Sequence, residues 1–304
     1  MALLEVLQHN AIAFYGVVAF LSLLVGSFLN VVIYRLPIMM ENEWREALQE
    51  MDAPDDGMTQ TESADNTDQA NTATAPATFN LSVPRSRCPN CDNLITWWQN
   101  VPVLSYLMLR GKCANCKTPI SARYPIIEIV TMVLSLAIAW QFGPSLQSVI
   151  GIFVTWMLIA MTMIDFDHQL LPDSLTLPMM WIGLLASLVP VFTDVRSAVI
   201  GGALGYMILW GVYQIFKLIT GKEGMGFGDF KLLAALGALL GWQLVPMIIL
   251  LSSAVGAVVG ISLIVIKGRD KNIPIPFGPY LAAAGWLAMM WGAPLAEQYY
   301  RLFA

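Results

Sequence analysis

Charged residues are scarce in this chain of 304 residues: Asp, Glu, Lys and Arg together make up 12% of it. Hydrophobic residues make up 57%, and the mean hydropathy is +0.64. Soluble domains rarely combine so little charge with so much apolar surface, so the composition excludes an ordinary soluble protein. We therefore expect an integral membrane protein.

Two features of other membrane or secreted chains are also missing. No alternation of polar and apolar residues over about ten positions recurs, which argues against a membrane β-barrel. The N-terminus lacks the basic region, short apolar core and small-residue cleavage site of a secretory signal. We expect its apolar run, which begins near Ala11, to be retained as a first membrane helix.

Long apolar runs are abundant, and about 20 apolar residues suffice to cross a bilayer as a helix. The sequence predicts an all-α polytopic membrane protein with about eight transmembrane helices. The expected spans are residues 11–35, 124–142, 146–164, 174–193, 197–219, 229–241, 243–266 and 277–295. The sixth is short and is weakened by Gly237 and Gly241, so a half-length or tilted element is expected there.

The few basic residues are divided unequally between the two sides of this topology. Fourteen of the 16 lie in or beside the loops of one side, and the positive-inside rule makes that side cytoplasmic. They are Arg35, Arg45, Arg85, Arg87, Arg110, Lys112, Lys117, Arg123, Lys217, Lys222, Lys231, Lys267, Arg269 and Lys271. Only Arg196 and Arg301 fall on the other side, where both termini are expected.

The longest loop, 36–123, separates the first predicted helix, 1–35, from a predicted membrane domain of seven helices, 124–304. The first half of this loop is acidic, since residues 41–83 contain ten acidic residues and one basic residue. With few apolar side chains to bury, residues 51–78 are predicted to be disordered. The acidic insert is either a solvated spacer or a tract that attracts a basic partner.

All four cysteines of the chain lie in the second half of the loop, within a predicted zinc-binding subdomain at 84–123. They form two C-x-x-C pairs, Cys88 with Cys91 and Cys113 with Cys116, with 21 residues between the pairs. Two such pairs can present four thiolates to one zinc ion, as in a zinc ribbon, and leave no open position for water. The zinc is therefore expected to be structural. The alternatives are an iron or redox role and two disulfides, which a reducing cytoplasm disfavours.

Ionisable groups at membrane depth are costly, so the acidic residues at predicted span ends each require a reason. Asp173 follows Pro172 at the start of a predicted helix, where it or Ser174 can cap backbone N–H groups. Asp165 follows an apolar helix, and the dipole at a helix C-terminus disfavours negative charge. Asp229 begins the sixth predicted span, where it would equally suit a helix cap.

Asp165 and Asp229 both fall at cytoplasmic span ends in this topology, which allows them to face each other. Two facing carboxylates can share one proton, so that one activates a water while the other polarises a scissile carbonyl. Gly224, Gly226 and Gly228 precede Asp229 and would leave room for a substrate backbone. No serine, cysteine or histidine forms a competing site, so an aspartic mechanism inside a membrane fits these residues best.

Two other classes of protein share parts of this inventory. An ion- or proton-coupled transporter would also carry carboxylates in its spans, but at mid-membrane depth in broken helices. A non-enzymatic zinc-ribbon assembly factor of a secretion or pilus system would explain the cysteines and leave Asp165 and Asp229 as helix caps. The residues considered one by one leave both alternatives open.

Several motifs occur together from the first predicted span to the last. They are GSFLNVVIYRLP (26–37), the two C-x-x-C pairs, LRGKC (109–113), RYPIIE (123–128), IDFDHQLLPD (164–173) and GMGFGDFK (224–231). With these motifs the chain resembles the type IV prepilin peptidases, which are membrane aspartic proteases of bacteria. The G-x-G-D motif alone would be weak, whereas the joint spacing of all the motifs is specific.

This resemblance implies a bacterial inner-membrane enzyme with its active site on the cytoplasmic side and both termini in the periplasm. Such enzymes remove the basic leader of type IV prepilins and type II secretion pseudopilins, cutting after a glycine. Many then methylate the new N-terminal residue, usually phenylalanine, with S-adenosylmethionine. The two catalytic aspartates of the family carry over to Asp165 and Asp229, which selects Asp165 over Asp167, and its zinc ligands carry over to the four cysteines. Prepilins, pseudopilins and membrane lipid are the expected partners, and no nucleic acid is expected.

For methyl transfer the sequence is less informative, because the glycine-rich strand-to-helix fingerprint of a soluble Rossmann methyltransferase is missing. Gly111, Lys112 and Glu128 are the candidates for binding S-adenosylmethionine. Gly111 would equally suit a turn, and Glu128 would equally pair with Arg123 near the start of the second span.

Overall fold

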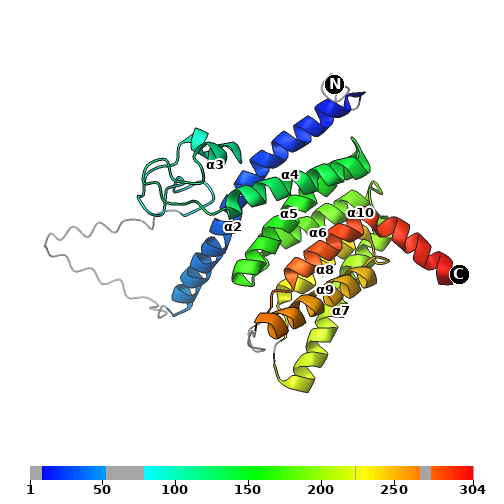
Figure 1. Ribbon diagram of the computed structural model, residues 1–304. Coiled ribbons are helices and arrows are strands. Elements are labelled where there is room, and N and C mark those ends of the chain that lie inside the picture. The colour runs from blue at the N-terminus through cyan, green and yellow to red at the C-terminus, as the bar shows by residue number, and fades with distance from the viewer. Residues whose placement is uncertain (1–8, 53–78, 223, 268–274, 304) are drawn as a thin grey trace, which may run out of the picture.

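The computed structural model describes residues 9–52, 79–222, 224–267 and 275–303, which form a helical bundle with a small loop subdomain beside it (Figure 1). Eight of the described helices, each of 14 residues or more, correspond one to one with the predicted spans. They are α2 (Ala11–Asp52), α4 (Arg123–Phe142), α5 (Leu146–His168), α6 (Asp173–Ser187), α7 (Val195–Thr220), α8 (Phe227–Leu240), α9 (Val245–Lys267) and α10 (Gly278–Phe303). The loop subdomain adds the 3-10 helix η1 (Trp97–Asn100) and the short helix α3 (Leu104–Met108).

Five of these helices are long and apolar enough to cross a membrane: α2, α4, α5, α7 and α9. The predicted short sixth element is confirmed, since α8 has only 14 residues. The predicted end of the fourth span at residue 193 is wrong, because α6 ends at Ser187 and the chain turns at 188–190. Pro190 lies in that turn, and a proline there disfavours a longer helix because it has no backbone N–H to donate.

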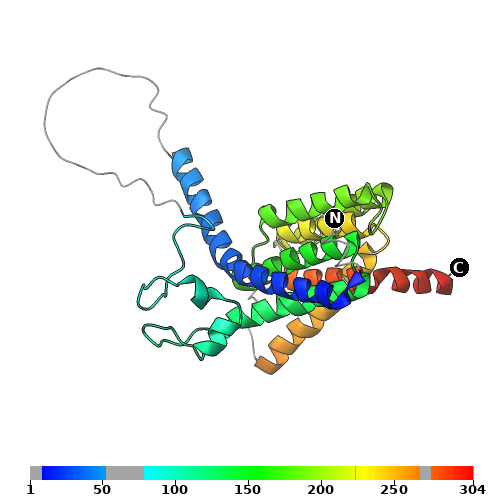
Figure 2. The same ribbon diagram turned by 90° about the horizontal axis from the view of Figure 1, so that it is seen from above.

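The first helix is longer than predicted. α2 continues past residue 35 to Asp52, with Pro37 inside it, and the side chains of residues 43–51 are exposed. Good helix formers and an ion pair from Arg45 to Glu41, one turn apart, favour this extension. Figure 2 shows the extension pointing away from the other helices. Met51 and Asp52 are therefore helical, and the rest of the predicted disordered tract lies outside the described residues.

The short helix α8 lies at the centre of the bundle and contacts α6, α7, α9 and α10. Eleven of its 14 residues are buried, as expected of a helix that is apolar on all sides. The contact with α7 is the closest, because a Cβ built on Gly201 would lie 2.2 Å from the carbonyl oxygen of Gly237. Only glycine permits this backbone-to-backbone approach.

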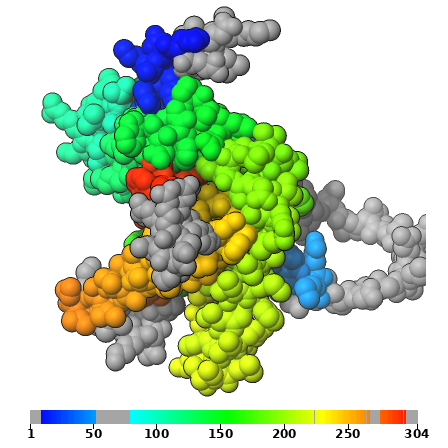
Figure 3. Space-filling view, turned by 90° about the vertical axis from the view of Figure 1, so that its right-hand side faces the viewer, coloured from blue at the N-terminus to red at the C-terminus, as the bar shows by residue number. Residues whose placement is uncertain are grey.

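A second apolar cluster joins α2, α4 and α5 and contains Leu29, Ile127 and Ile164. Here a Cβ on Gly26 would lie 2.8 Å from the Cα of Glu128, so α2 packs closely against α4 within the same chain. On the other side of the molecule the last turns of α7 project from the body of the bundle (Figure 3). Asp165 and Asp229, the candidate catalytic residues, lie at the end of α5 and at the start of α8.

Candidate active site and metal centre

A cavity of about 380 Å³ opens where the end of α5, the start of α8 and the segment before α10 meet. Asp165, in the last turn of α5, and Asp229, in the first turn of α8, both line it. Their side chains are almost withdrawn from solvent, at 5% and 8% exposure. The structure thus brings the two sequence-predicted carboxylates into one cavity. Asp165 comes from the C-terminal end of α5, and Asp229 comes from the N-terminal end of α8.

Asp165 is held by a backbone group. The N–H of Gly278, the first residue of α10, donates to Asp165 Oδ2 at 2.9 Å. A Cβ at position 278 would lie 2.6 Å from that same oxygen, so only glycine leaves room for the carboxylate. Gly278 was not predicted from sequence, although a glycine between two prolines just before an apolar run (PFGPYL) is a signal of a special backbone position.

Asp229 has a different environment. It is the third residue of α8, whose N-cap is Gly226, and its carboxylate is hydrogen-bonded to the backbone of that glycine. The capping interpretation of Asp229 thus holds in part, because its carboxylate reaches back to the N-cap backbone and the start of a helix favours a negative charge. Its Oδ1 is buried and has no hydrogen-bond partner among the described residues. A buried unpaired oxygen costs about 1–3 kcal/mol, so this atom is suited to receive a proton, a water or a substrate group.

The two neighbouring acids of the same motif are both engaged in ion pairs. Asp173 does not cap α6; its carboxylate accepts from Lys231 Nζ at 2.6 and 2.7 Å. Asp167 accepts both guanidinium N–H groups of Arg123, one of them at 2.9 Å. The predicted pairing of Arg123 with Glu128 is therefore wrong. Of the three aspartates near this edge, only Asp165 lines the cavity without a cationic partner.

The three glycines before Asp229 all line the cavity but have different surroundings. A Cβ on Gly226 would meet nothing within 4 Å, so this position faces open space. A Cβ on Gly228 would lie 2.6 Å from Leu171, and one on Gly224 would lie 2.7 Å from the ring of Phe216. Gly224 and Gly228 thus allow close packing, and Gly226 keeps the cavity open.

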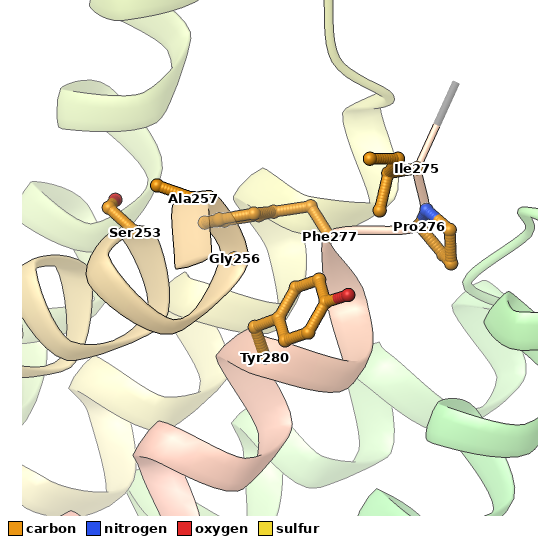
Figure 4. Close-up of a pocket in the computed structure, with 7 residues that line it drawn as sticks. All are labelled: Ser253, Gly256, Ala257, Ile275, Pro276, Phe277 and Tyr280. Carbon is orange, nitrogen blue, oxygen red and sulfur yellow. The ribbon is translucent and has the colours of Figure 1, made fainter. Parts of the chain in front are cut away.

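A second pocket, of about 250 Å³, lies against the same wall (Figure 4). Ile275, Pro276 and Phe277 line both this pocket and the catalytic cavity. The remaining lining residues are Ser253, Gly256 and Ala257 of α9 and Tyr280 of α10. In Figure 4 the Phe277 side chain extends toward α9 above the Tyr280 ring. A mainly apolar pocket therefore adjoins the two carboxylates.

The four cysteines form the second candidate site. Their sulfur atoms all lie within 4.8 Å of one another, and Cys88 Sγ is 3.8 Å from Cys116 Sγ. A tetrahedral zinc site with Zn–S bonds of about 2.3 Å separates its sulfurs by about 3.8 Å. All four are free cysteines, not disulfides. The donor set therefore fits the predicted zinc.

The two C-x-x-C pairs have the same local fold. Cys88 N donates to Asn93 O at 3.0 Å, and Cys113 N donates to Thr118 O at 2.9 Å. An isolated β-bridge flanks each pair, from Arg87 to Leu94 and from Lys112 to Pro119. Paired turns of this kind, each closed by a short bridge, resemble the knuckles of a zinc ribbon.

The surroundings of the sulfurs favour metal binding. The Thr118 hydroxyl lies 3.2 Å from Cys116 Sγ, and hydrogen bonds from this hydroxyl, from the Thr118 backbone and from Asn90 lower the pKa of that thiol to about 5. Asn115 Nδ2 donates to Cys91 Sγ at 3.6 Å. The thiolate is the form of cysteine that ligates a metal, and hydrogen bonds from outside the ligand set orient it.

The three methyl-transfer candidates do not form one cluster. Gly111 and Lys112 follow the end of α3, whereas Glu128 in α4 accepts the backbone N–H of Val103, just before α3, at 2.8 Å. Gly111 has a φ of +67°, as its alternative as a turn residue predicted. Lys112 is exposed, and its ammonium has no hydrogen-bond or ion-pair partner among the described residues. The role of these residues in methyl transfer stays a prediction.

Comparison with known proteins assigns the chain to a family. Residues 20–142 match the model of the bacterial peptidase A24 N-terminal domain, and residues 152–261 match that of the type IV leader peptidase family. A prepilin leader peptidase/N-methyltransferase of Aeromonas hydrophila is 50% identical over 300 residues, 98% of each chain. Proteins of the same name from Stutzerimonas stutzeri and Pseudomonas aeruginosa are 49% and 47% identical over 97% and 98% of this chain and 96% and 98% of their own.

No solved structure matches the chain. The sequence matches nonetheless cover both parts of the molecule that carry a candidate site, the loop with its cysteines and the bundle with its aspartates. The identities extend over nearly the whole length of each relative. The chain therefore belongs to the type IV leader peptidase family.

Proposed function

We propose that this protein is a bifunctional membrane enzyme that cleaves the basic leader from type IV prepilins and type II secretion pseudopilins after a glycine, and then methylates the new N-terminal residue. The observation that carries the proposal is the cavity in which Asp165 and Asp229 meet. The relatives named above are prepilin leader peptidases that also carry the name N-methyltransferase.

The proposed topology has eight membrane-embedded helices, with both termini in the periplasm and the carboxylates near the cytoplasmic edge of a bacterial inner membrane. Basic residues support this orientation, because Arg123 and Lys231 lie at the same ends of the bundle as the cavity. In this arrangement α6 and α8 are too short to span alone and are shielded by longer neighbours.

In the proposed cleavage step the two carboxylates share one proton. One of them takes a proton from the attacking water while the other donates a hydrogen bond to the scissile carbonyl, where negative charge develops. Because Gly278 N–H donates to Asp165 Oδ2, a proton carried by Asp165 would sit on Oδ1. Asp229 Oδ1, which has no partner among the described residues, is the atom best suited to meet the water or the carbonyl.

The pocket between α9 and α10 suits an apolar side chain of the substrate next to the scissile bond. It shares Ile275, Pro276 and Phe277 with the catalytic cavity, so a peptide bound at Asp165 and Asp229 would pass it directly. The open surroundings of Gly226 leave the opposite wall free for the backbone of the leader.

For methyl transfer, the proposed elements are structural zinc at the four cysteines and a binding site for S-adenosylmethionine that includes Lys112. Bound S-adenosylmethionine supplies the methyl group. The exposed ammonium of Lys112 suits a carboxylate such as that of the cofactor's amino-acid part. Gly111 and Glu128 would act less directly, Gly111 by the turn it permits and Glu128 by holding the start of α3.

The alternatives receive less support from the site. A transporter would need its carboxylates at mid-membrane depth, whereas Asp165 and Asp229 lie in terminal turns of their helices. An assembly factor without activity would leave both as helix caps, which does not account for the buried, unpartnered Oδ1 of Asp229 in the cavity.

The proposal is tested with the purified protein in lipid, a full-length prepilin and S-adenosylmethionine, with products identified by mass. The parent protein should release the leader and add one methyl group to the mature chain. Asp165→Asn and Asp229→Asn should each abolish release of the leader. Undiminished cleavage by either variant would refute the dyad, and a parent protein that cleaves no prepilin would refute the proposed function.

A further inference from the structure

The helix α3 in the loop subdomain exposes an apolar face that the proposed reactions do not use. Leu104, Leu107 and Met108 are 61%, 64% and 77% exposed, and no residue of α3 is buried. Their spacing of three and four residues places them on one side of the helix. We call these three side chains the α3 face. A water-facing loop would not be expected to collect its apolar residues in this way.

A hydrogen bond ties the start of α3 to the bundle. Val103, the N-cap of α3, donates its backbone N–H to Glu128 Oε2 at 2.8 Å. Glu128 lies five residues after Arg123, the first residue of α4, which at a rise of 1.5 Å per residue is about 7.5 Å into that helix. α4 is one of the helices that are able to cross a membrane. The start of α3 is therefore level with the first two turns of a membrane helix and does not lie beyond its end.

The surroundings of α3 at this level are those of a membrane interface. Figures 1 and 2 both place α3 beside the start of α4. On α4 itself, Tyr124 and Ile126 are exposed, so the start of this membrane helix also presents apolar side chains to its surroundings. Trp97 of η1, which contacts α3, is 82% exposed, and tryptophan is enriched where bilayers meet water.

Charge at the other end of α3 fits the same partner. Arg110, two residues after the last residue of α3, is exposed. Basic side chains beside an apolar helix face are attracted to the anionic headgroups of a bilayer. A soluble protein partner would not explain why the face is level with a membrane helix.

We propose that α3 is a membrane-interface anchor, in which Leu104, Leu107 and Met108 insert into the boundary between lipid headgroups and acyl chains. The anchor holds the zinc-binding loop against the bilayer at a second point, in addition to its covalent link to α4. The partner of the α3 face is the lipid surface, and the contact does not require substrate or cofactor.

Spin labels on the α3 face test this anchor. A ketone-bearing amino acid is introduced at position 107 or 108 of the full-length protein and is labelled with an oxime reagent, which leaves the four cysteines untouched. The protein is placed in lipid nanodiscs containing anionic lipid. Accessibility to oxygen, which partitions into lipid, is compared with accessibility to a water-soluble nickel chelate.

Two control positions calibrate the measurement. Asn93, exposed in the loop, should give a water-like label, and Ile126, exposed on α4, should give a lipid-like label. We expect the labels at 107 and 108 to resemble that at 126, with oxygen access exceeding nickel access. Labels at 107 and 108 that resemble that at 93 would overturn the proposal. Labels shielded from both reagents would also overturn it, because a protein surface would then cover the face. Unchanged zinc content verifies that each labelled loop is folded.

Discussion

The membrane bundle and the cysteine-containing loop are built in opposite ways. In the bundle, 11 of the 14 residues of α8 are buried, and its backbone touches that of α7 through Gly201 and Gly237. In the loop, neither η1 nor α3 contains a buried residue. The bundle is thus held by close packing, whereas the loop depends on four cysteines and a few hydrogen bonds such as that from Val103 to Glu128. Changes in one part should therefore leave the activity of the other largely intact.

Replacing a catalytic aspartate is expected to separate the two activities most strongly, by removing cleavage and preserving methyl transfer. Asp165→Asn should reduce prepilin cleavage by at least about 100-fold, because a carboxylate that takes part in proton transfer contributes about this much or more. The same variant should still methylate a mature pilin from which the leader has already been removed, since the loop does not contact the cavity-lining carboxylates. Mass spectrometry of both reactions measures the two rates.

Asp167→Asn is the matched control for this prediction. It removes a carboxylate two residues away whose oxygens are already bound to Arg123 and which does not line the cavity. Its cleavage rate should stay within a few-fold of the parent rate. Loss of methylation of mature pilin in Asp165→Asn would show that the two activities are not separable in this way.

A smaller effect on cleavage is expected from a residue that only positions the carboxylate. Gly278→Ala would place a methyl carbon 2.6 Å from Asp165 Oδ2, so the side chain must shift. A displacement of about 1 Å can cost up to about 100-fold in rate, so Gly278→Ala should slow cleavage by no more than about 100-fold. Gly211→Ala in α7 is the control, because a Cβ there meets nothing within 4 Å. Equal cleavage by the two variants would contradict a positioning role for Gly278.

A change in the loop is expected to have the opposite effect, reducing methyl transfer and preserving cleavage. Cys113→Ser removes one of the four proposed zinc ligands, and structural zinc sites contribute folding free energy directly. We expect the bound zinc to be lost and methyl transfer to fall by at least about tenfold, while cleavage changes little. Zinc content by elemental analysis, proteolysis of the loop and the two activities are the measurements. Cleavage that falls in parallel with methylation would show that the bundle depends on the loop.

Local patterns predicted the features that depend on local physics. Apolar runs located all eight helices, and C-x-x-C spacing located four sulfurs that the fold brings within 4.8 Å. The joint position of Asp165 and Asp229 at one edge followed from charge asymmetry along the chain, and the structure places both in one cavity.

Contacts between distant segments were not predictable in the same way. Gly278 and Asp165 are 113 residues apart in the chain. No local pattern around either residue predicts that the Gly278 N–H donates to the Asp165 carboxylate. The alternative in which Glu128 pairs with Arg123 is not realised. Arg123 binds Asp167 instead, which only the packing of α4 against α5 brings close. The end of α6 was also missed, since hydropathy continues past the turn at Pro190.

The smallest effect is expected where an ion pair links two helices at the edge of the catalytic cavity. Lys231 Nζ bonds both carboxylate oxygens of Asp173, joining the start of α8 to the start of α6 two residues from Asp229. Both side chains are partly exposed, and such pairs contribute about 0–1 kcal/mol. Asp173→Asn should therefore slow cleavage by no more than about fivefold. If Asp173 were itself a catalytic group, the loss would approach that of Asp165→Asn, and Lys231→Met would not reproduce it. Similar small losses in the two single variants, with no further loss in the double variant, would identify the pair as a brace between α6 and α8.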